Sequence, residues 1–327
     1  MAAAAALVAV VLLARQVFLP GPLAEFGKLP LPVAGLEPSQ GAAGGPGFTF
    51  DFSYRLGADL AGGWPRFPER ELAYRLRRPQ FTEEWVSRLA SGLGIQAPVV
   101  REGWHDSYLL AADPGEGRAA LRMFPNGYTV FTQPFEYGPA GGPGLPGDVR
   151  ALALARQWLE ESGFVPPGEL GAGTVTRDHE SGTVLVRFAP AEPGDVVTTS
   201  PFAVAQIGTG ERIVMASATW YPAEASSPYP LRGVAQAWDE VESGRGVLEW
   251  AVTEYSGPVG EDNIVRGLAT VGRVRLAWSL AIAPDGTPYL VPVYAFSGTV
   301  EVPGAEGPES LPFEVWAPAV TRSHTGD

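Results

Sequence analysis

Side chains that could carry out chemistry are few in this sequence and lie far apart. The three histidines are His105, His179 and His324. His105 and His179 each precede an acidic residue, but neither pair has the i, i+4 or H-x-x-H spacing of a metal site on a helix. A histidine beside an acid in a turn is a more common arrangement than a metal ligand. The sequence therefore predicts no metal site and no bound cofactor.

Clustered carboxylates are the next candidates, since paired acids can act as general acid and base. They occur at Glu83-Glu84, Glu160-Glu161 and Asp239-Glu240-Glu242 in expected helices, and at Glu261-Asp262-Asn263 in an expected loop. On a helix such groups usually form the solvated face, and the loop has too few oxygen ligands in series for a calcium site. The sequence contains no nucleophile-elbow, P-loop or dinucleotide-binding motif. We therefore assign no catalytic residue, and a hydrolase with a hidden site stays as an alternative.

Aromatic residues are the remaining candidates, because nine tryptophans and ten tyrosines are many for 327 residues. Those expected in or beside loops are Trp64, Trp104, Trp220, Tyr221, Tyr229, Trp250 and Tyr255. Flat aromatic faces near hydroxyl and carboxyl groups suit sugar rings or the apolar side chains of a partner protein. The same residues would also serve as core and rim packing of a tryptophan-rich sheet. Both interpretations are open from the sequence.

The composition limits the class of protein. Hydrophobic residues make up 45% of the chain and charged residues 18%, which is enough apolar material for a sizeable core and excludes global disorder. The formal charge of −13 argues against nucleic acid as a partner, because phosphate binding needs a basic face. Cysteine is absent, which excludes disulfides, thiolate metal sites and cysteine nucleophiles.

Residues 1–19 are expected to be a hydrophobic anchor or signal segment that places the body outside the cytoplasm, at the cell membrane. An uncharged apolar run of 13 residues, Ala2–Ala14, precedes Arg15; it is shorter than the ~20 residues that span a bilayer. A buried apolar helix or an alanine-rich tail is the alternative. Residues 20–47 are rich in proline and glycine and lack an apolar period, which predicts a linker or an irregular segment on the surface of the body.

Residues 48–138 are expected to form an N-terminal α+β domain. Alternating aromatic residues predict a half-buried strand over 48–54, and Thr82 is the expected N-cap of a helix over 82–95. Strands are predicted at 107–111, 119–124 and 128–131, the last two joined by a hairpin turn at Asn126-Gly127. A glycine- and proline-rich stretch, 138–146, is the expected domain boundary.

Residues 147–320 are expected to form a C-terminal α+β domain with two helix–strand units. Helices are predicted over 147–164, with Asp148 as N-cap, and over 229–246. The expected strands cover 174–176, 183–188, 202–207, 212–220 and 313–316, with a long hairpin over 271–298 that turns at Asp285-Gly286. Pro292 predicts that the return strand of this hairpin is an edge or contains a bulge.

A weak internal repeat accompanies the helices. Each ends in Ser-Gly, at Ser91-Gly92, Ser162-Gly163 and Ser243-Gly244, with a tryptophan five to seven residues before the glycine. The glycine is expected in the left-handed C′ position, and the tryptophan is expected to cover a sheet. Duplication and ordinary capping both account for this pattern.

The order of a helix and then three or four antiparallel strands, twice over behind one hydrophobic segment, resembles the extracytoplasmic PepSY-like and YycI-like proteins of Gram-positive bacteria. Four segments carry the likeness, which covers roughly residues 80–320: Leu93-Gly94-Ile95, 147–164, Tyr229-Pro230-Leu231 and Tyr289–Phe296. The resemblance implies an α+β fold of two domains, each an antiparallel sheet with a helix packed on one face, in a PepSY-like or cystatin-like tandem. It also implies a membrane-tethered regulatory or binding module without catalytic residues.

The expected function is therefore that of a non-enzymatic extracytoplasmic module that binds and regulates another envelope protein, for example a sensor kinase. A module that binds cell-wall glycan or peptide through the loop aromatics is the alternative, and the hidden hydrolase is a third reading.

Overall fold

A computed structural model describes residues 26–31, 49–78, 81–103, 108–112, 119–135, 144–178, 181–197, 201–245, 247–251, 264–304 and 307–326. The chain divides into two compact units. One, the inserted unit, is residues 77–222; the other, the discontinuous unit, combines residues 1–76 and 223–327. The chain thus leaves the discontinuous unit, completes the inserted unit and returns.

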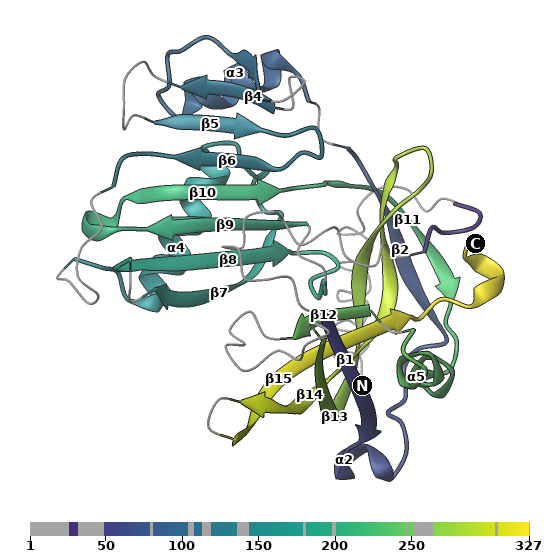
Figure 1. Cartoon of the computed structure of the whole chain (residues 1–327). Coiled ribbons are helices and arrows are strands. Elements are labelled where there is room, and N and C mark those ends of the chain that lie inside the picture. The colour runs from purple at the N-terminus through teal and green to yellow at the C-terminus, as the bar shows by residue number, and fades with distance from the viewer. Residues whose placement is uncertain are drawn as a thin grey trace, which may run out of the picture. The chain divides into compact units, whose positions relative to one another are not determined.

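The inserted unit contains an antiparallel sheet of eight strands in the order β3-β4-β5-β6-β10-β9-β8-β7. Figure 1 shows the strands of this sheet lying side by side. The strands are β3 (Val100–Glu102), β4 (Tyr108–Ala112), β5 (Ala120–Met123), β6 (Thr129–Thr132), β7 (Leu170–Asp178), β8 (Thr183–Pro190), β9 (Phe202–Ile207) and β10 (Ile213–Thr219). The short 3-10 helix η1 (Thr209–Glu211) links β9 to β10.

Two helices, α3 (Glu83–Gly92) and α4 (Asp148–Glu161), pack on one face of this sheet. The expected N-cap of α3 is confirmed, because the Thr82 hydroxyl accepts a hydrogen bond of 3.2 Å from the backbone N–H of Trp85. The expected cap of α4 is wrong: Gly147 is the N-cap, and Asp148 is the first helical residue. The Asp148 carboxylate instead accepts a 2.6 Å ion-pair bond from Arg177 on β7, which ties the start of the helix to the sheet edge.

The inserted unit has an internal symmetry that its strand order reveals. Each half is a helix followed by a four-stranded meander, α3 with β3 to β6 and α4 with β7 to β10. The last strands of the two meanders, β6 and β10, pair antiparallel in the middle of the sheet. The eight strands consequently bury the two inner edges that separate four-stranded sheets would expose.

The discontinuous unit contains a mixed sheet of seven strands: β1 (Thr49–Leu56), β2 (Arg70–Leu76), β11 (Ala223–Pro230), β12 (Val247–Ala251), β13 (Ile264–Ile282), β14 (Pro288–Gly304) and β15 (Gly307–Pro318). The path β1-β13-β14-β15-β12 forms most of the sheet, and β2 joins β14 to β11. β1 is parallel to β13, a pairing of residues more than two hundred positions apart in sequence. The long hairpin with its turn at Asp285-Gly286 is confirmed, since β13 and β14 pair along most of their length.

Helix α5 (Val234–Glu242) packs against β15 and β1, and the short helix α2 (Ala58–Ala61) packs against β13. A buried ion pair fixes α5: both Nη atoms of Arg232 donate to the Glu240 carboxylate at 2.7 Å. Arg322, at the start of the 3-10 helix η2 (Arg322–His324), donates a further bond of 2.5 Å. The Tyr294 hydroxyl donates to the Arg232 carbonyl, so this set of bonds joins the helix, the sheet and the C-terminal segment.

The expected fold class, an α+β tandem of two helix-on-sheet domains, is wrong. The described structure is dominated by strands, and it contains two large sheets, of seven and eight strands. The helix-and-meander halves that were assigned to different domains share one sheet through β6 and β10. The units also do not follow the expected bounds of 48–138 and 147–320. Strand patterns along the chain indicate each meander but do not specify which strands pair at long separation.

Two local features of the discontinuous unit also differ from expectation. The third helix begins at Val234 and ends at Glu242, because residues 229–230 belong to β11. Pro292 lies inside the central strand β14 and not at an edge. It occupies the point where β14 changes neighbour, from β2 at Tyr289 and Leu290 to β15 from Val293 onward. Its carbonyl accepts from Ala319, and a proline is tolerated there because it lacks only the N–H.

The described part of the expected linker is the short segment 26–31. Leu29 in it is buried, and it forms a parallel bridge with Thr325 near the C-terminus. At least this part of residues 20–47 therefore lies on the folded body, as the alternative interpretation held. The hydrophobic segment 1–19 lies outside the described residues. Across the residues that are described, no helix has the length and apolar character needed to cross a bilayer.

Candidate functional site

The ends of the two helices in the inserted unit meet above the β6–β10 pair. The two ends lie within van der Waals reach of each other, since a Cβ built on Gly92 would lie 3.6 Å from the Ser162 carbonyl oxygen, and one on Gly163 would lie 3.8 Å from Leu89 Cδ1. The expected left-handed glycine is confirmed at Gly163, which has φ +79°. In α3 this position belongs to Gly94, with φ +78°, and Gly92 is the last helical residue.

A groove of about 540 Å³ lies beside these helix ends. Its lining comes from both halves of the unit: the end of α3, the C-terminal half of α4, the end of β6 and the start of β10. The lining residues are Gly92, Leu93, Phe131, Gln133, Leu154, Gln157, Trp158, Glu161, Ser162, Glu211, Arg212 and Ile213. The volume is within the range of roughly 300–1,000 Å³ typical of ligand sites.

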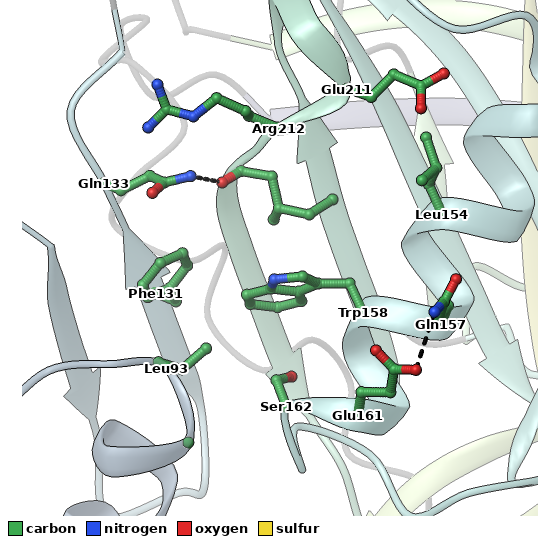
Figure 2. Close-up of a pocket in the computed structure, with 12 residues that line it drawn as sticks. Leu93, Phe131, Gln133, Leu154, Gln157, Trp158, Glu161, Ser162, Glu211 and Arg212 are labelled. Atoms are coloured by element: carbon green, nitrogen blue, oxygen red, sulfur yellow. Dashed lines mark hydrogen bonds between the residues drawn. The ribbon is translucent and has the colours of Figure 1, made fainter.

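Aromatic rings form the floor of the groove. Figure 2 shows the Trp158 indole in the middle, between Phe131 and helix α4. The ring centroid of Trp158 lies 5.4 Å from that of Phe131 and 5.5 Å from that of Phe164, so contacts with both rings restrict the indole. Trp158 and Leu154 lie one turn apart on α4 and are half-buried, since their faces toward the groove are not covered. An apolar or flat group could pack on this floor.

Polar side chains surround the floor. The Gln133 side-chain amide donates to the Ile213 carbonyl, which links β6 to β10, and Gln157 donates to Glu161 at 2.9 Å on the exposed face of α4 (Figure 2). Carboxamides of this kind can both donate to and accept from a bound peptide or a sugar.

Two adjacent charged residues on the groove rim differ in their pairing. The Glu211 carboxylate receives bonds from Arg150, the shortest 2.7 Å, and these hydrogen bonds lower the pKa of Glu211. Arg212 forms no ion pair with any residue in the described ranges. The rim therefore offers one cation whose charge is not matched by a carboxylate in the described part of the unit.

The predicted aromatic residues do not form one site. Two of them lie at the C-terminal end of the inserted unit. Trp220 donates its indole N–H to Glu169 at 2.6 Å, and the Tyr221 hydroxyl donates to the Asn126 carbonyl at 2.6 Å. Both are buried, at 7% and 9% exposure, and burial raises the pKa of Tyr221. Their polar atoms are hydrogen-bonded and both side chains are packed, as the alternative interpretation held, and Trp220 also lines a second pocket of the unit.

The other predicted aromatics belong to the discontinuous unit or fall outside the described residues. Tyr229 is buried and donates to the Gly27 carbonyl at 2.8 Å, and Trp64 packs against Trp238 and Phe296. Trp250 is in β12, where only the backbone is described. Trp104 and Tyr255 lie outside the described residues.

The remaining polar candidates are likewise separate. His324 is in η2, where its Nδ1 lies 2.9 Å from the Thr321 hydroxyl oxygen. His105, His179 and the acidic loop at 261–263 lie outside the described residues. Within the described part of the chain, no three histidine, aspartate or glutamate side chains come together as a metal site would require.

Sequence reasoning missed the groove, although one signal was present. Trp158 belongs to the repeated pattern of a tryptophan before Ser-Gly, which predicts a residue that covers a sheet. Trp158 does cover the sheet, through Phe131. The groove requires the second half of the unit, because Leu93 and Phe131 reach Trp158 only when β6 pairs with β10.

Comparison with known proteins yields weak structural likenesses. No protein-family profile matches the sequence, and no curated protein matches it significantly. An uncharacterized protein from Eubacterium rectale is similar over 84% of this chain and 89% of its own, with 10% identity and a TM-score of 0.48. The C-terminal domain of YpeB from Bacillus megaterium is similar over 72% of this chain and 99% of its own, with 13% identity and a TM-score of 0.30.

The resemblance to PepSY-like proteins is a prediction that these likenesses do not test. Similarity at this level leaves the family and the function open. The likeness to YycI-like proteins stays a prediction.

Proposed function

We propose that this protein is a non-enzymatic module of the cell envelope that binds and regulates another envelope protein, for example a sensor kinase. The hydrophobic segment 1–19 would tether it to the cell membrane with its body outside the cytoplasm. The groove beside Trp158 would hold an extended segment of the partner, with an apolar side chain on the aromatic floor.

The observation that carries this proposal is the combination of a rigid apolar floor with a polar rim. Trp158 packs against Phe131 and Phe164, so little ordering would be needed when a partner side chain packs on it. Gln157 and Arg212 at the rim offer hydrogen bonds and a cation to the partner's backbone and acidic groups. Half-exposed tryptophan and arginine are residue types that dominate binding energy at protein interfaces.

A second candidate function is binding of cell-wall glycan or peptide. It is favoured by the same indole, because a flat aromatic face next to planar carboxamides also suits a sugar ring. The two candidates differ in what the groove retains: a folded envelope protein in one case, and the wall polymer alone in the other.

The experiment is affinity capture of the full-length chain from crosslinked membranes, with two variants on α4. Gln157→Trp places an indole in the groove and blocks it. Ala153→Trp is the matched control, because Ala153 is exposed on the same helix and does not line the groove. We expect the unchanged protein and Ala153→Trp to recover one envelope protein in near-equal amount, and Gln157→Trp to lose it.

Retention on purified wall polymer, lost in Gln157→Trp and without an associated envelope protein, would support the glycan alternative. Equal recovery of the same protein with all three chains would refute the groove as the binding site.

A further inference from the structure

A second pocket, of about 250 Å³, lies in the inserted unit on the other side of the helix ends. It takes Trp85 from the first turn of α3 and residues 163–166 from the segment after α4, whereas the groove takes the end of α3 and the body of α4. The two cavities are thus counterparts in the two halves of the unit. The pocket is lined by Arg77, Arg78, Trp85, Gly127, Thr129, Gly163, Phe164, Pro166, Ala218, Trp220 and Pro222.

The charges of this pocket differ from those of the groove. Arg77 and Arg78 are the charged residues in its described lining, whereas the groove carries both signs. Both arginines are exposed, and neither forms an ion pair within the described parts of the chain. In a chain with a net charge of −13, these two adjacent arginines give the described lining of this pocket two positive charges and no negative one.

Rigid apolar walls stand next to these cations. The bond from the Trp220 indole N–H to Glu169, 2.6 Å long, fixes the indole and occupies its donor, which leaves the ring surface to line the pocket. Trp85, which also lines the pocket, is half-buried, and Phe164 is buried. The backbone N–H of Trp85 is held by the Thr82 cap, so the first turn of the helix positions this wall.

We propose that this pocket binds an oxyanion, either a carboxylate or a phosphate, carried on a small apolar group. The guanidinium groups of Arg77 and Arg78 hold the anion, because their planar N–H donors match the oxygens of both anions. The apolar group lies against Trp85 and Trp220, and the cavity has room for a single ring-sized group. This ligand site is independent of the function proposed for the groove.

The test is isothermal titration of the full-length chain with three probes that share a benzene ring. Phenyl phosphate and phenylacetate carry the two anions, and benzyl alcohol is the neutral counterpart. The variant Arg77→Gln/Arg78→Gln removes both guanidinium groups and keeps much of each side chain. The control Arg66→Gln/Arg88→Gln removes the same charge from two exposed arginines that do not line the pocket.

We expect at least one anion to bind the unchanged protein, and the tighter of the two distinguishes a phosphate ligand from a carboxylate one. Arg77→Gln/Arg78→Gln should weaken binding by about tenfold or more, the control should bind as the unchanged protein does, and benzyl alcohol should bind at least tenfold more weakly than the anion. Trp85→Leu should also weaken binding of the anion, and an unchanged circular dichroism spectrum would show that the variant is folded.

Three results would overturn the proposal: no binding of either anion at millimolar concentration, the same loss in the control variant, or equal binding of benzyl alcohol. The second of these would mean that only the total charge of the protein attracts the anion.

Discussion

Replacement of Glu240 by glutamine should destabilise the discontinuous unit by an amount that depends on pH. Glu240 on α5 is almost fully buried, with 11% of its side chain exposed, and Arg232 is exposed by only 6%. Glutamine keeps the shape of the side chain but leaves the buried guanidinium of Arg232 without a countercharge. A charge left unpaired in this way is more costly than the loss of an ordinary hydrogen bond.

The magnitude follows from the pKa of Glu240. Hydrogen bonds from Arg232, with a further contribution from Arg322, outweigh the opposing effect of burial and lower this pKa from 4.5 to about 2. Each unit of pKa corresponds to ~1.4 kcal/mol, so the ionised carboxylate contributes about 3 kcal/mol to the free energy of unfolding at pH 7. Breaking a buried ion pair costs roughly 3–5 kcal/mol in other proteins, which agrees.

The sign of the pH dependence is fixed by the direction of this shift. Because the pKa is lower in the folded protein than in the unfolded chain, the contribution is complete above about pH 4.5 and is lost as the pH falls toward 2. Glu240→Gln lacks the contribution at every pH. The difference in stability between the two proteins should therefore be about 3 kcal/mol at pH 7 and should shrink toward zero near pH 2.

The assay is urea unfolding at a series of pH values, with pulsed hydrogen exchange of peptides from β14 and β15 as the probe of the discontinuous unit. Glu242→Gln is the matched control, because Glu242 is exposed on the same helix. It should change the free energy of unfolding by less than about 0.5 kcal/mol. A loss in Glu240→Gln that stays constant from pH 7 to pH 2, or one no larger than that of the control, would refute the reasoning.

Three further predictions concern the backbone, the inserted unit and the N-terminus. Gly298→Ala should destabilise the discontinuous unit by about 3 kcal/mol in urea unfolding, because the new Cβ would lie 2.0 Å from the Thr270 carbonyl oxygen; Gly272→Ala, where a Cβ meets no atom within 4 Å, should have little effect. Arg156→Lys should lower the unfolding free energy of the inserted unit by ~1–2 kcal/mol, since lysine cannot make the paired 2.6 Å bonds to the carbonyls of Leu170 and Gly171. A variant as stable as the unchanged protein would contradict this prediction. The native protein should sediment with membranes, with its N-terminus determined by sequencing; a soluble cytoplasmic pool would count against the tether.

Local features of the fold could be predicted because they depend on neighbouring residues. The Thr82 cap follows from a hydroxyl placed three residues before the N–H that it accepts from, and the turn at Asn126-Gly127 requires a glycine, which has φ +80° in the structure. The Asp285-Gly286 turn is of the same kind. Each of these signals operates within a few residues.

Long-range pairing could not be predicted in the same way. Strands β6 and β10 pair although the glycine- and proline-rich stretch that predicts a domain boundary lies between them in the sequence. Strands β1 and β13 pair although the whole inserted unit lies between them in the sequence. Neither pairing alters the alternation of apolar residues along the two strands that it joins. The groove depends on the first of these pairings, which is why the sequence predicts that Trp158 covers a sheet but does not predict a groove beside it.

Site-specific photo-crosslinking in cells that produce the full-length protein tests the central claim most directly. A photoreactive phenylalanine derivative would replace Gln157 in the lining of the groove or, in the control, Ala153, an exposed residue of α4 that is not part of that lining. The account predicts one discrete heavier protein adduct in the membrane fraction from position 157 and none from position 153. No adduct at position 157, or the same adduct from both positions, would contradict it.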